Sequence, residues 1–308
     1  MQIFDTLGNK KTELEFSDKV RIYLCGVTVY DDAHIGHART IIVFDVLRRF
    51  LESQNIPVEF IQNFTDVDDK IIDRAQQEKI SPLELAAKYT KNYFDDFDGL
   101  NIKRATIYPK ATEHIEDMQN LISNLVDKKY AYVTKNGVYF SVSKFTEYGK
   151  LSKKKTDDLI SGARVAVDEE KSNPIDFALW KFSNSEPSWD SPWGKGRPGW
   201  HIECSAMSLK YLGENFEIHG GGRDLIFPHH ENEIAQSESF IQNQFAKIWM
   251  HVGMITINGE KMSKSLGNVK SVNHVLDNWG PNIIRLFCLS GSYSKPIDYS
   301  EKLLKENI

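Results

Sequence analysis

Two apolar runs with an amphipathic segment between them form the clearest pattern near the start of the chain. Val20–Cys25 and Val58–Ile61 are short and mostly apolar, which is typical of strands buried in a sheet. Between them, apolar side chains recur at helical spacing, which predicts a helix from near Gly36 to about Ser53. These side chains are Val43, Val46, Leu47, Phe50 and Leu51. Strand, helix and strand make a βαβ unit, so we expect an α/β fold with a parallel sheet and a site at the carboxyl ends of its strands.

Weaker patterns follow in the next part of the chain. Helical spacing fills Asp73 to Leu100 and Glu113 to Lys128. From Tyr130 to Ser143 apolar and polar residues alternate around Asn136-Gly137, which predicts a hairpin. Lys144 to Pro198 is rich in Lys, Asp, Ser, Pro and Trp and shows little periodicity, so no regular element is predicted there.

These changes of pattern predict how the chain is divided. We expect a first half of the sheet domain over residues 1–112, an insertion over 113–198, a second half over 199–253 and a small module over 254–308. The last residues, from Ser300 onward, open like a capped helix that then stops. The expectation from this abrupt end is that a C-terminal region is missing.

Composition narrows the class of protein. The 308 residues are 41% apolar and 26% charged, which is ordinary for a globular protein, and no apolar run approaches the length of a membrane span. Three cysteines argue against a disulfide framework and for a reducing compartment. The net charge of −5 gives no general attraction to nucleic acid, so any RNA contact must use local patches.

Cysteine, histidine and glutamate residues suggest a metal site. Cys25 ends the first predicted strand, and Cys204 follows a Trp-His-Ile-Glu stretch. His229 and Glu233 are spaced i and i+4, on one face of a helix; His230 with Glu233 is the alternative, on another face. Thiolate, imidazole and carboxylate suit zinc. Because there is no Cys-x-x-Cys pair, the spacing alone leaves open that these cysteines are only small buried apolar residues.

Two further segments point to a nucleotide. His34-Ile35-Gly36-His37 begins the first predicted helix, where backbone N–H groups and the helix dipole favour anions. Lys261-Met262-Ser263-Lys264-Ser265 lies in a loop flanked by glycines. Each segment alone is a weak signal, because such histidines are usually structural and such lysines usually solvated. Together they predict a site that holds a nucleoside triphosphate from two sides.

The two segments resemble the HIGH and KMSKS signatures of class I aminoacyl-tRNA synthetases, and the chain as a whole resembles the cysteinyl-tRNA synthetases. The matching stretches are Cys25–Asp31, His34–His37, Thr65–Lys70, Gly162–Val165, Asn173–Lys181, Gly199–Met207, His219–Gly222, Asp224–Glu233 and Lys261–Asn268. They run in order along nearly the whole chain.

The resemblance implies a Rossmann-like α/β catalytic fold with helices on both faces of the sheet, a connective insertion and a small module that carries the KMSKS loop. It implies activation of cysteine by ATP with Mg²⁺ and transfer of the cysteinyl group to tRNA(Cys), in a cytoplasmic and monomeric enzyme. The helical region that helps such enzymes bind the anticodon is expected to be absent. The alternatives are a cysteine ligase with a small-molecule amine acceptor and a non-catalytic relative.

The resemblance also assigns site residues. The implied catalytic residues are His34, His37, Lys261 and Lys264, and the ATP site adds Gly36, Ser263 and Ser265. The implied zinc ligands are Cys25, Cys204, His229 and Glu233. The implied cysteine pocket is formed by Gly26, Thr65, Trp200 and Asp224, with the last as partner of the substrate ammonium. Zinc that binds the substrate sulfur would select cysteine over serine and alanine, so no editing site is expected. His219–Gly222 is interpreted as a flexible turn, and Lys153–Lys155 as a solvated turn.

Overall fold

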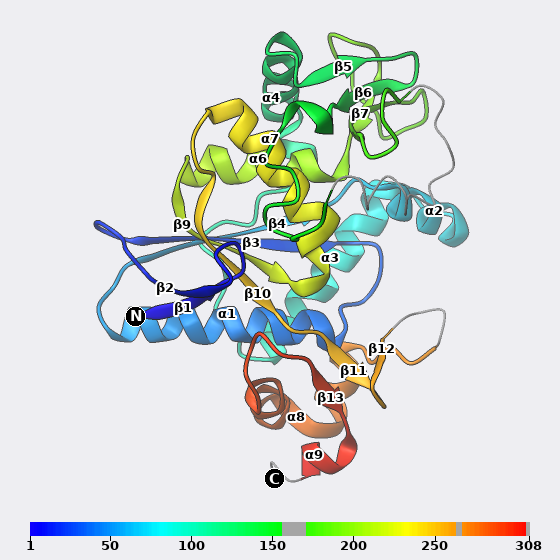
Figure 1. Cartoon of the computed structure of the whole chain (residues 1–308). Helices are drawn as coiled ribbons and strands as arrows, with labels where there is room; N and C mark the ends of the chain where they lie inside the picture. Colours follow the sequence, from blue (N-terminus) through cyan, green and yellow to red (C-terminus); the bar gives the residue numbers. More distant parts are fainter. Residues whose placement is uncertain (156–170, 263–266, 306–308) are drawn as a thin grey trace.

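The computed structural model describes residues 1–155, 171–262 and 267–305. Its centre is a four-stranded parallel sheet of order β10-β9-β3-β4 (Figure 1). The strands are β3 (Val20–Thr28), β4 (Val58–Thr65), β9 (Phe216–Gly222) and β10 (Ala246–Val252). The predicted α/β class and the first βαβ unit are therefore confirmed, with both predicted strands several residues longer than their apolar runs.

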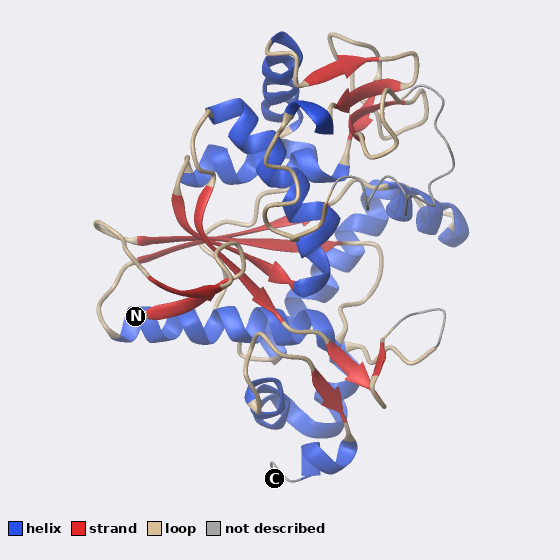
Figure 2. Ribbon diagram, in the orientation of Figure 1, coloured by secondary structure: helices blue, strands red, loops and turns tan. Residues whose placement is uncertain are grey.

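Helices cover both faces of this sheet (Figure 2). Ile22 and Leu24 of β3 pack into the core on the side of α1 (Ile35–Ser53), whereas Tyr23 and Cys25 pack on the side of α6 and α7. Helix α6 spans Trp200–Leu212 and α7 spans Glu231–Ile241. Because successive side chains of a strand point to opposite faces, a strand covered on both sides must be apolar throughout. This explains why every residue from Ile22 to Cys25 is apolar or aromatic, and it directs Cys25 toward α6 and α7.

The strand order creates a crevice at one edge of the sheet. From β3 the chain passes through α1 to β4 on one side, and from β9 it passes through α7 to β10 on the other. Since β3 and β9 are neighbours whose connections diverge, their carboxyl ends bound a topological switch point, where open parallel sheets bind ligands.

The predicted long helix between residues 73 and 100 is two helices, α2 (Asp69–Glu78) and α3 (Pro82–Gly99). Lys79 ends the first with φ at 57°, and Ser81 caps the second with Pro82 at its first turn. The polar stretch 76–79 and the Ser81-Pro82 pair mark this break in the sequence itself, but the break was not predicted. The next helix, α4 (Ile115–Asp127), agrees with its prediction and follows a short 3-10 turn, η1 (Ala111–Glu113).

The insertion is a four-stranded antiparallel sheet of order β5-β6-β7-β8. The predicted hairpin is present as β5 (Ala131–Val133) and β6 (Gly137–Phe140), followed by η2 (Val142–Lys144). Strands β7 (Phe177–Phe182) and β8 (Gly196–Pro198) were not predicted: β8 is very short, and the apolar run of β7 lies in an otherwise polar region. Lys181 and Arg197, from these two strands, form ion pairs with Asp69 at the start of α2 and so tie the insertion to the first half.

The C-terminal part contains β11 (Ile255–Ile257), β12 (Glu260–Lys261), α8 (Val272–Leu289), β13 (Ile297–Tyr299) and α9 (Glu301–Lys305). Its strands form a small sheet of order β12-β11-β13, and α8 packs against α1. The expected helix after Ser300 is α9. A hairpin of β1 (Gln2–Asp5) and β2 (Lys10–Glu13) precedes β3. The 3-10 turn η3 (Arg223–Leu225) and the π-turn η4 (Ile226–His230) lead into α7. No helix within the described ranges is both long and apolar enough to cross a lipid bilayer.

Candidate functional site

A cavity of about 490 Å³ lies at the carboxyl ends of the parallel strands. The end of β3, the start of α1 and the joint between β10 and β11 supply much of its wall. Among its lining residues are seven that the sequence proposed for the site: Cys25, Gly26, His34, Gly36, His37, Trp200 and Asp224. The structure therefore brings together residues from both halves of the sheet domain.

The remaining proposed residues fall elsewhere. Thr65 is buried at the end of β4 and is not among the lining residues; its hydroxyl is hydrogen-bonded to Glu203 Oε2 at 2.7 Å. Lys261 belongs to β12. Ser263, Lys264 and Ser265 lie outside the described residues.

His34 and His37 form the N-terminal cap of α1. The Nδ1 atom of His34 accepts hydrogen bonds from the backbone N–H groups of Gly36 and His37 at 3.1 and 3.3 Å. The Nδ1 atom of His37 accepts from the backbone N–H of His34 at 3.3 Å, and the two rings stack with centroids 3.7 Å apart. Because each Nδ1 uses its lone pair, the proton of each neutral ring is on Nε2. The cap thus sets both tautomers at a helix end that favours anions.

The chain that follows the lysine-rich loop is hydrogen-bonded to this cap. The backbone N–H of Ile35 donates to Lys270 O at 2.9 Å, and that of Val272 donates to Ala33 O at 2.8 Å. Met262, inside the lysine-rich segment, lines the same cavity. Met262 and the chain around Lys270–Val272 therefore lie at the same cavity as the His34–His37 cap, and the part that the lysines play there stays a prediction.

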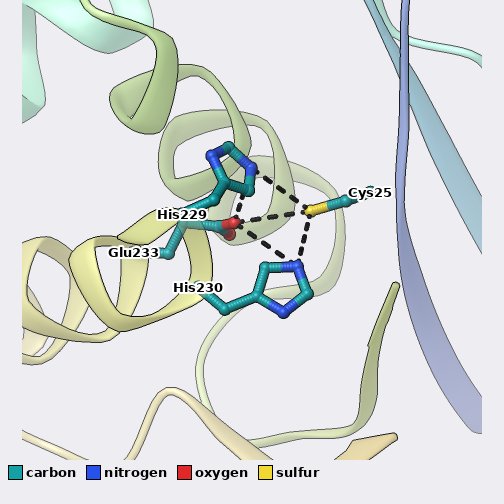
Figure 3. Close-up of side chains that lie close together, drawn as sticks. All are labelled: Cys25, His229, His230 and Glu233. Atoms are coloured by element: carbon teal, nitrogen blue, oxygen red, sulfur yellow. Dashed lines mark hydrogen bonds and ion pairs between the residues drawn. The ribbon is translucent and has the colours of Figure 1, made fainter. Parts of the chain in front are cut away.

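Behind the cavity lie four buried candidate metal ligands, Cys25, His229, His230 and Glu233, a group that does not include Cys204 (Figure 3). The Sγ atom of Cys25 is 3.6 Å from both Cys204 Sγ and His229 Nε2, and His229 Nε2 is 3.0 Å from Glu233 Oε1. His230 is also close, with Nε2 3.3 Å from Cys25 Sγ and 3.9 Å from Glu233 Oε1. The structure brings together both candidate histidines with Glu233, so the choice between them stays a prediction. This cluster of sulfur, nitrogen and oxygen donors can bind a metal ion.

Other histidines hold the cluster in place. His229 Nδ1 lies 2.8 Å from His201 Nδ1, His230 Nδ1 lies 2.8 Å from His251 Nε2, and His219 Nε2 lies 2.8 Å from Glu233 Oε2. Such outer contacts orient metal ligands and select their tautomers. The sequence analysis did not assign these three roles, because the partners come from α6, β9 and β10 and share no local spacing.

The interpretation of His219–Gly222 as a flexible turn was wrong. These residues end β9, and the His219 ring is buried against Trp249, with centroids 4.3 Å apart. Glycines suggested a turn, but a Cβ on Gly220 would lie 2.0 Å from the Phe44 ring. Close packing of α1 on the strand therefore explains that glycine.

Interactions inside the cluster shift the pKa values of its buried members in different directions. Burial opposes ionisation of Cys204, but the hydrogen bond from Cys25 and the neighbouring His229 lower its pKa to about 6. Burial likewise opposes ionisation of Glu233, but His219 and His229 hold its pKa well below the usual range. Against the effect of burial, the Glu233 carboxylate and Cys204 raise the pKa of His229 to about 10. Cys204 and Glu233 are thus the acidic groups of the cluster and His229 its basic one, while burial and the neighbouring Cys204 raise the pKa of the Cys25 thiol well above its usual value.

Three of the residues proposed for the cysteine pocket, Gly26, Trp200 and Asp224, line the cavity. The Trp200 ring stacks on the His229 ring with centroids 4.2 Å apart, and Asp224 is exposed on the cavity wall. Gly26 donates its backbone N–H to Asn63 Oδ1 at 2.9 Å, and a Cβ there would lie 1.6 Å from Asn63 O. Only glycine allows β3 and β4 to approach this closely.

The family described as "tRNA synthetases class I (C) catalytic domain" matches residues 12–308. The chain belongs to this family. A cysteine--tRNA ligase of Thermodesulfovibrio yellowstonii is 60% identical over 99% of the chain, which spans 64% of that relative's length. One from Thermococcus kodakarensis is 54% identical over 99% of the chain, which spans 65% of its length. The chain thus covers a little under two thirds of these relatives.

The class I fold is also found among solved structures. Mycobacterium tuberculosis methionyl-tRNA synthetase, in complex with methionyl-adenylate, superposes with a TM-score of 0.73 over 94% of this chain and 68% of that one. At 16% identity this likeness concerns the fold alone. The Rossmann-like α/β fold expected from the sequence is confirmed.

Proposed function

We propose that this chain carries the catalytic part of a cysteine--tRNA ligase, which activates cysteine with ATP and then transfers it to the 3′ end of tRNA(Cys). The high identity to relatives that carry this name supports the proposal. The observation that carries it is the position of the Cys25, Cys204, His229 and Glu233 cluster directly behind a cavity that begins at the His34–His37 cap.

In the activation step the substrate carboxylate attacks the α-phosphate of ATP, and pyrophosphate leaves. Negative charge grows on the phosphate oxygens, so the site needs fixed donors and cations there. We assign the first part to the Nε2–H groups of His34 and His37 and to the N-terminus of α1, with room left by Gly36. Lys261 and Lys264, with Ser263 and Ser265, are proposed to hold the β- and γ-phosphates together with Mg²⁺.

The metal of the cluster is proposed to be zinc, held by Cys25, Cys204, His229 and Glu233. Two sulfurs, one imidazole and one carboxylate fit zinc by donor type, and the low pKa values of Cys204 and Glu233 supply the charge it requires. Bound zinc would take the substrate sulfur as a further ligand, which serine and alanine cannot match. The protein holds the remainder of cysteine with Gly26, Thr65, Trp200 and Asp224 in this proposal.

The hydrogen bond between Thr65 and Glu203 bears on the proposed role of Thr65. The Thr65 hydroxyl is hydrogen-bonded to Glu203 Oε2 at 2.7 Å, and because burial raises the pKa of the Glu203 carboxyl group well above its usual range, either group can supply the proton. In either case the Thr65 hydroxyl keeps a free lone pair, so in this proposal it accepts a hydrogen bond from the substrate ammonium. Asp224 offers a second acceptor at the cavity wall.

The acceptor of the cysteinyl group, the location and oligomeric state of the enzyme, and the division of the chain belong to the same proposal. We take the acceptor to be tRNA, the enzyme to be a cytoplasmic monomer, and the four segments 1–112, 113–198, 199–253 and 254–308 to be its catalytic halves, insertion and KMSKS module. A small-molecule amine is the other acceptor chemistry that the same activated cysteine would serve.

The experiment is cysteine-dependent ATP–pyrophosphate exchange, with serine as the control and zinc measured in the same sample. Exchange with cysteine alone and about one zinc per chain is the expected result. Exchange with serine at a similar rate would contradict metal-based selection. A folded, zinc-loaded sample without exchange would contradict the activation step. Acceptor assays with tRNA(Cys) and with an amino sugar then separate the two ligase classes.

A further inference from the structure

Arg39 lies on α1, two residues beyond the His34–His37 cap, and is fully buried. Its Nη1 donates to Gly253 O at 2.7 Å and to Met254 O at 3.1 Å. Its Nη2 donates to Ser292 O at 3.2 Å and to Lys295 O at 2.8 Å. Within the described part of the chain no carboxylate pairs with it. A buried guanidinium that is matched only by carbonyl oxygens is costly to keep, so its contacts call for an explanation.

The four carbonyls come from two segments that touch each other. Gly253 and Met254 join β10 to β11, while Ser292 and Lys295 lie before β13. A Cβ on Gly253 would be 2.2 Å from Lys295 O, and the Gly253 N–H donates to Tyr293 O at 2.8 Å. Arg39 therefore spans a close backbone crossing, between the sheet domain and the small C-terminal sheet.

One of these segments is also a wall of the cavity. Gly253, Met254 and Ile255 line it, and β11 leads through a turn into β12 with Lys261. In a trans peptide the carbonyl and the N–H point in opposite directions. When Arg39 binds Gly253 O, the Met254 N–H therefore points away from Arg39. No acceptor for that N–H lies among the described residues.

We infer that Arg39 is a positioning residue for the nucleotide: it clamps the β10–β11 joint onto α1 and so sets the backbone groups that the cavity offers to ATP. The inference rests on the proposed function, because that function supplies the nucleotide. In this role Arg39 does not touch the substrate. It holds α1, the cavity wall at Gly253–Ile255 and the start of the β11–β12 hairpin against each other.

The test compares Arg39→Met and Arg39→Lys with the wild-type chain. Three quantities are measured: the affinity for ATP with Mg²⁺ by calorimetry, the affinity for cysteine, and amide hydrogen exchange in residues 253–257 and 295–299. Arg39→Met is expected to weaken ATP binding by about tenfold to a hundredfold, the range for lost hydrogen bonds to a charged group. Cysteine affinity should stay within about twofold. Amide hydrogen exchange should become faster in both segments. For ATP affinity and for exchange, Arg39→Lys should give values between those of the wild-type chain and Arg39→Met.

Arg285→Met is the matched control. Arg285 also ties α8 to the first half, through Asp45 Oδ2 at 2.6 Å and Leu100 O at 3.3 Å, but it does not line the cavity. If Arg285→Met loses as much ATP affinity as Arg39→Met, then Arg39 is only one of several contacts that hold the C-terminal part in place, and the inference is overturned. Unchanged ATP affinity together with unchanged exchange in Arg39→Met would also overturn it.

Two further results separate the inference from the proposed function. If the wild-type chain binds ATP but shows no cysteine-dependent exchange, the function fails while the effect of Arg39 on ATP affinity still decides the inference. If it binds no ATP, the proposed nucleotide role is wrong for Arg39 as well. Should Arg39→Met not fold, Arg39→Lys and Gly253→Ala, which loosens the same crossing from its other side, give the same three measurements.

Discussion

The Sγ atoms of Cys25 and Cys204 lie 3.6 Å apart, although 179 residues separate them in the chain. This distance is far longer than a disulfide bond, and both thiols are free. Cys25 comes from β3 in the first half of the sheet domain and Cys204 from α6 in the second. The candidate metal site therefore exists only when the two halves are packed together, so metal loading reports on the folding of both.

Replacing Cys204 with serine is expected to remove a soft metal ligand and leave the nucleotide end of the cavity intact. Zinc affinity should fall by at least about a hundredfold, and cysteine affinity should fall with it, while ATP affinity stays nearly unchanged. Metal analysis and calorimetry with each substrate measure the three quantities. Cys288→Ala is the control, because Cys288 is buried in another core. Equal losses of cysteine and ATP affinity would count against a metal that binds substrate.

The two neighbouring histidines of the cluster should respond differently. His229 Nε2 is 3.0 Å from Glu233 Oε1, whereas His230 Nε2 is 3.9 Å from it. We expect His229→Asn to lose zinc almost completely, and His230→Asn to weaken zinc binding by about tenfold to a hundredfold, as an outer contact does. Competition with a chelator of known affinity measures both. The reverse order would make His230 the ligand.

Two substitutions of His34 separate its structural role from its chemical one. His34→Ala should lower the free energy of unfolding by about 1 kcal/mol, because the side-chain cap of α1 is lost. Asparagine caps helices well, so His34→Asn should recover that stability. Neither variant has the Nε2–H donor, so both should slow ATP–pyrophosphate exchange by about a hundredfold or more. Full exchange activity in His34→Asn would show that capping is the whole role of His34.

Gly26→Ala tests the close approach of β3 and β4. Since a Cβ would lie 1.6 Å from Asn63 O, the strands must shift. We expect a loss of about 1–3 kcal/mol in the free energy of unfolding and weaker cysteine binding, because Cys25 moves with the strand. Thermal unfolding and calorimetry are the measurements. Gly291→Ala is the control, since a Cβ there meets only Ile297 at 3.4 Å. A Gly26→Ala chain with wild-type stability would contradict the geometry.

Glu217 should make stability depend on pH. Burial alone would raise its pKa, but hydrogen bonds from Arg21 and Lys247 hold it below the ordinary value of 4.5. A pKa that is lower in the folded state stabilises the protein above the unfolded value, and this contribution disappears as pH falls below about 4.5. Glu217→Gln should lose about 2–3 kcal/mol at pH 7.

Denaturant unfolding at several pH values checks this prediction. The difference between wild type and Glu217→Gln should shrink as the pH falls below 4.5. A constant difference across that range would mean that lost packing, rather than charge, explains the effect. Glu84→Gln is a useful comparison, since Glu84 is an exposed capping residue whose pKa is also lowered.

Elements that are long and have a regular apolar pattern could be predicted from the sequence, whereas short elements in polar surroundings could not. Helix α1 has an apolar pattern that spans several turns, and strands β3 and β4 each begin with a mostly apolar run, so each element was predicted. Strands β7 and β8 are short and bury only a few side chains, among them Leu179 and Trp180 of β7, so polar neighbours hid them. The break between α2 and α3 was also missed, although the polar stretch 76–79 and the Ser81-Pro82 pair mark it in the sequence.

Taken alone, the amino-acid sequence determined which residues have the chemistry for a metal and a nucleotide, since side-chain type and the spacing of His229 and Glu233 are local properties. Only the tertiary structure decided how they meet. Parallel strands align their carboxyl ends, and this brought Cys25 of β3 beside Cys204 of α6. It also placed His201, His219 and His251 around the cluster and Arg39 against two distant loops, because packing, unlike spacing, joins residues that share no local pattern.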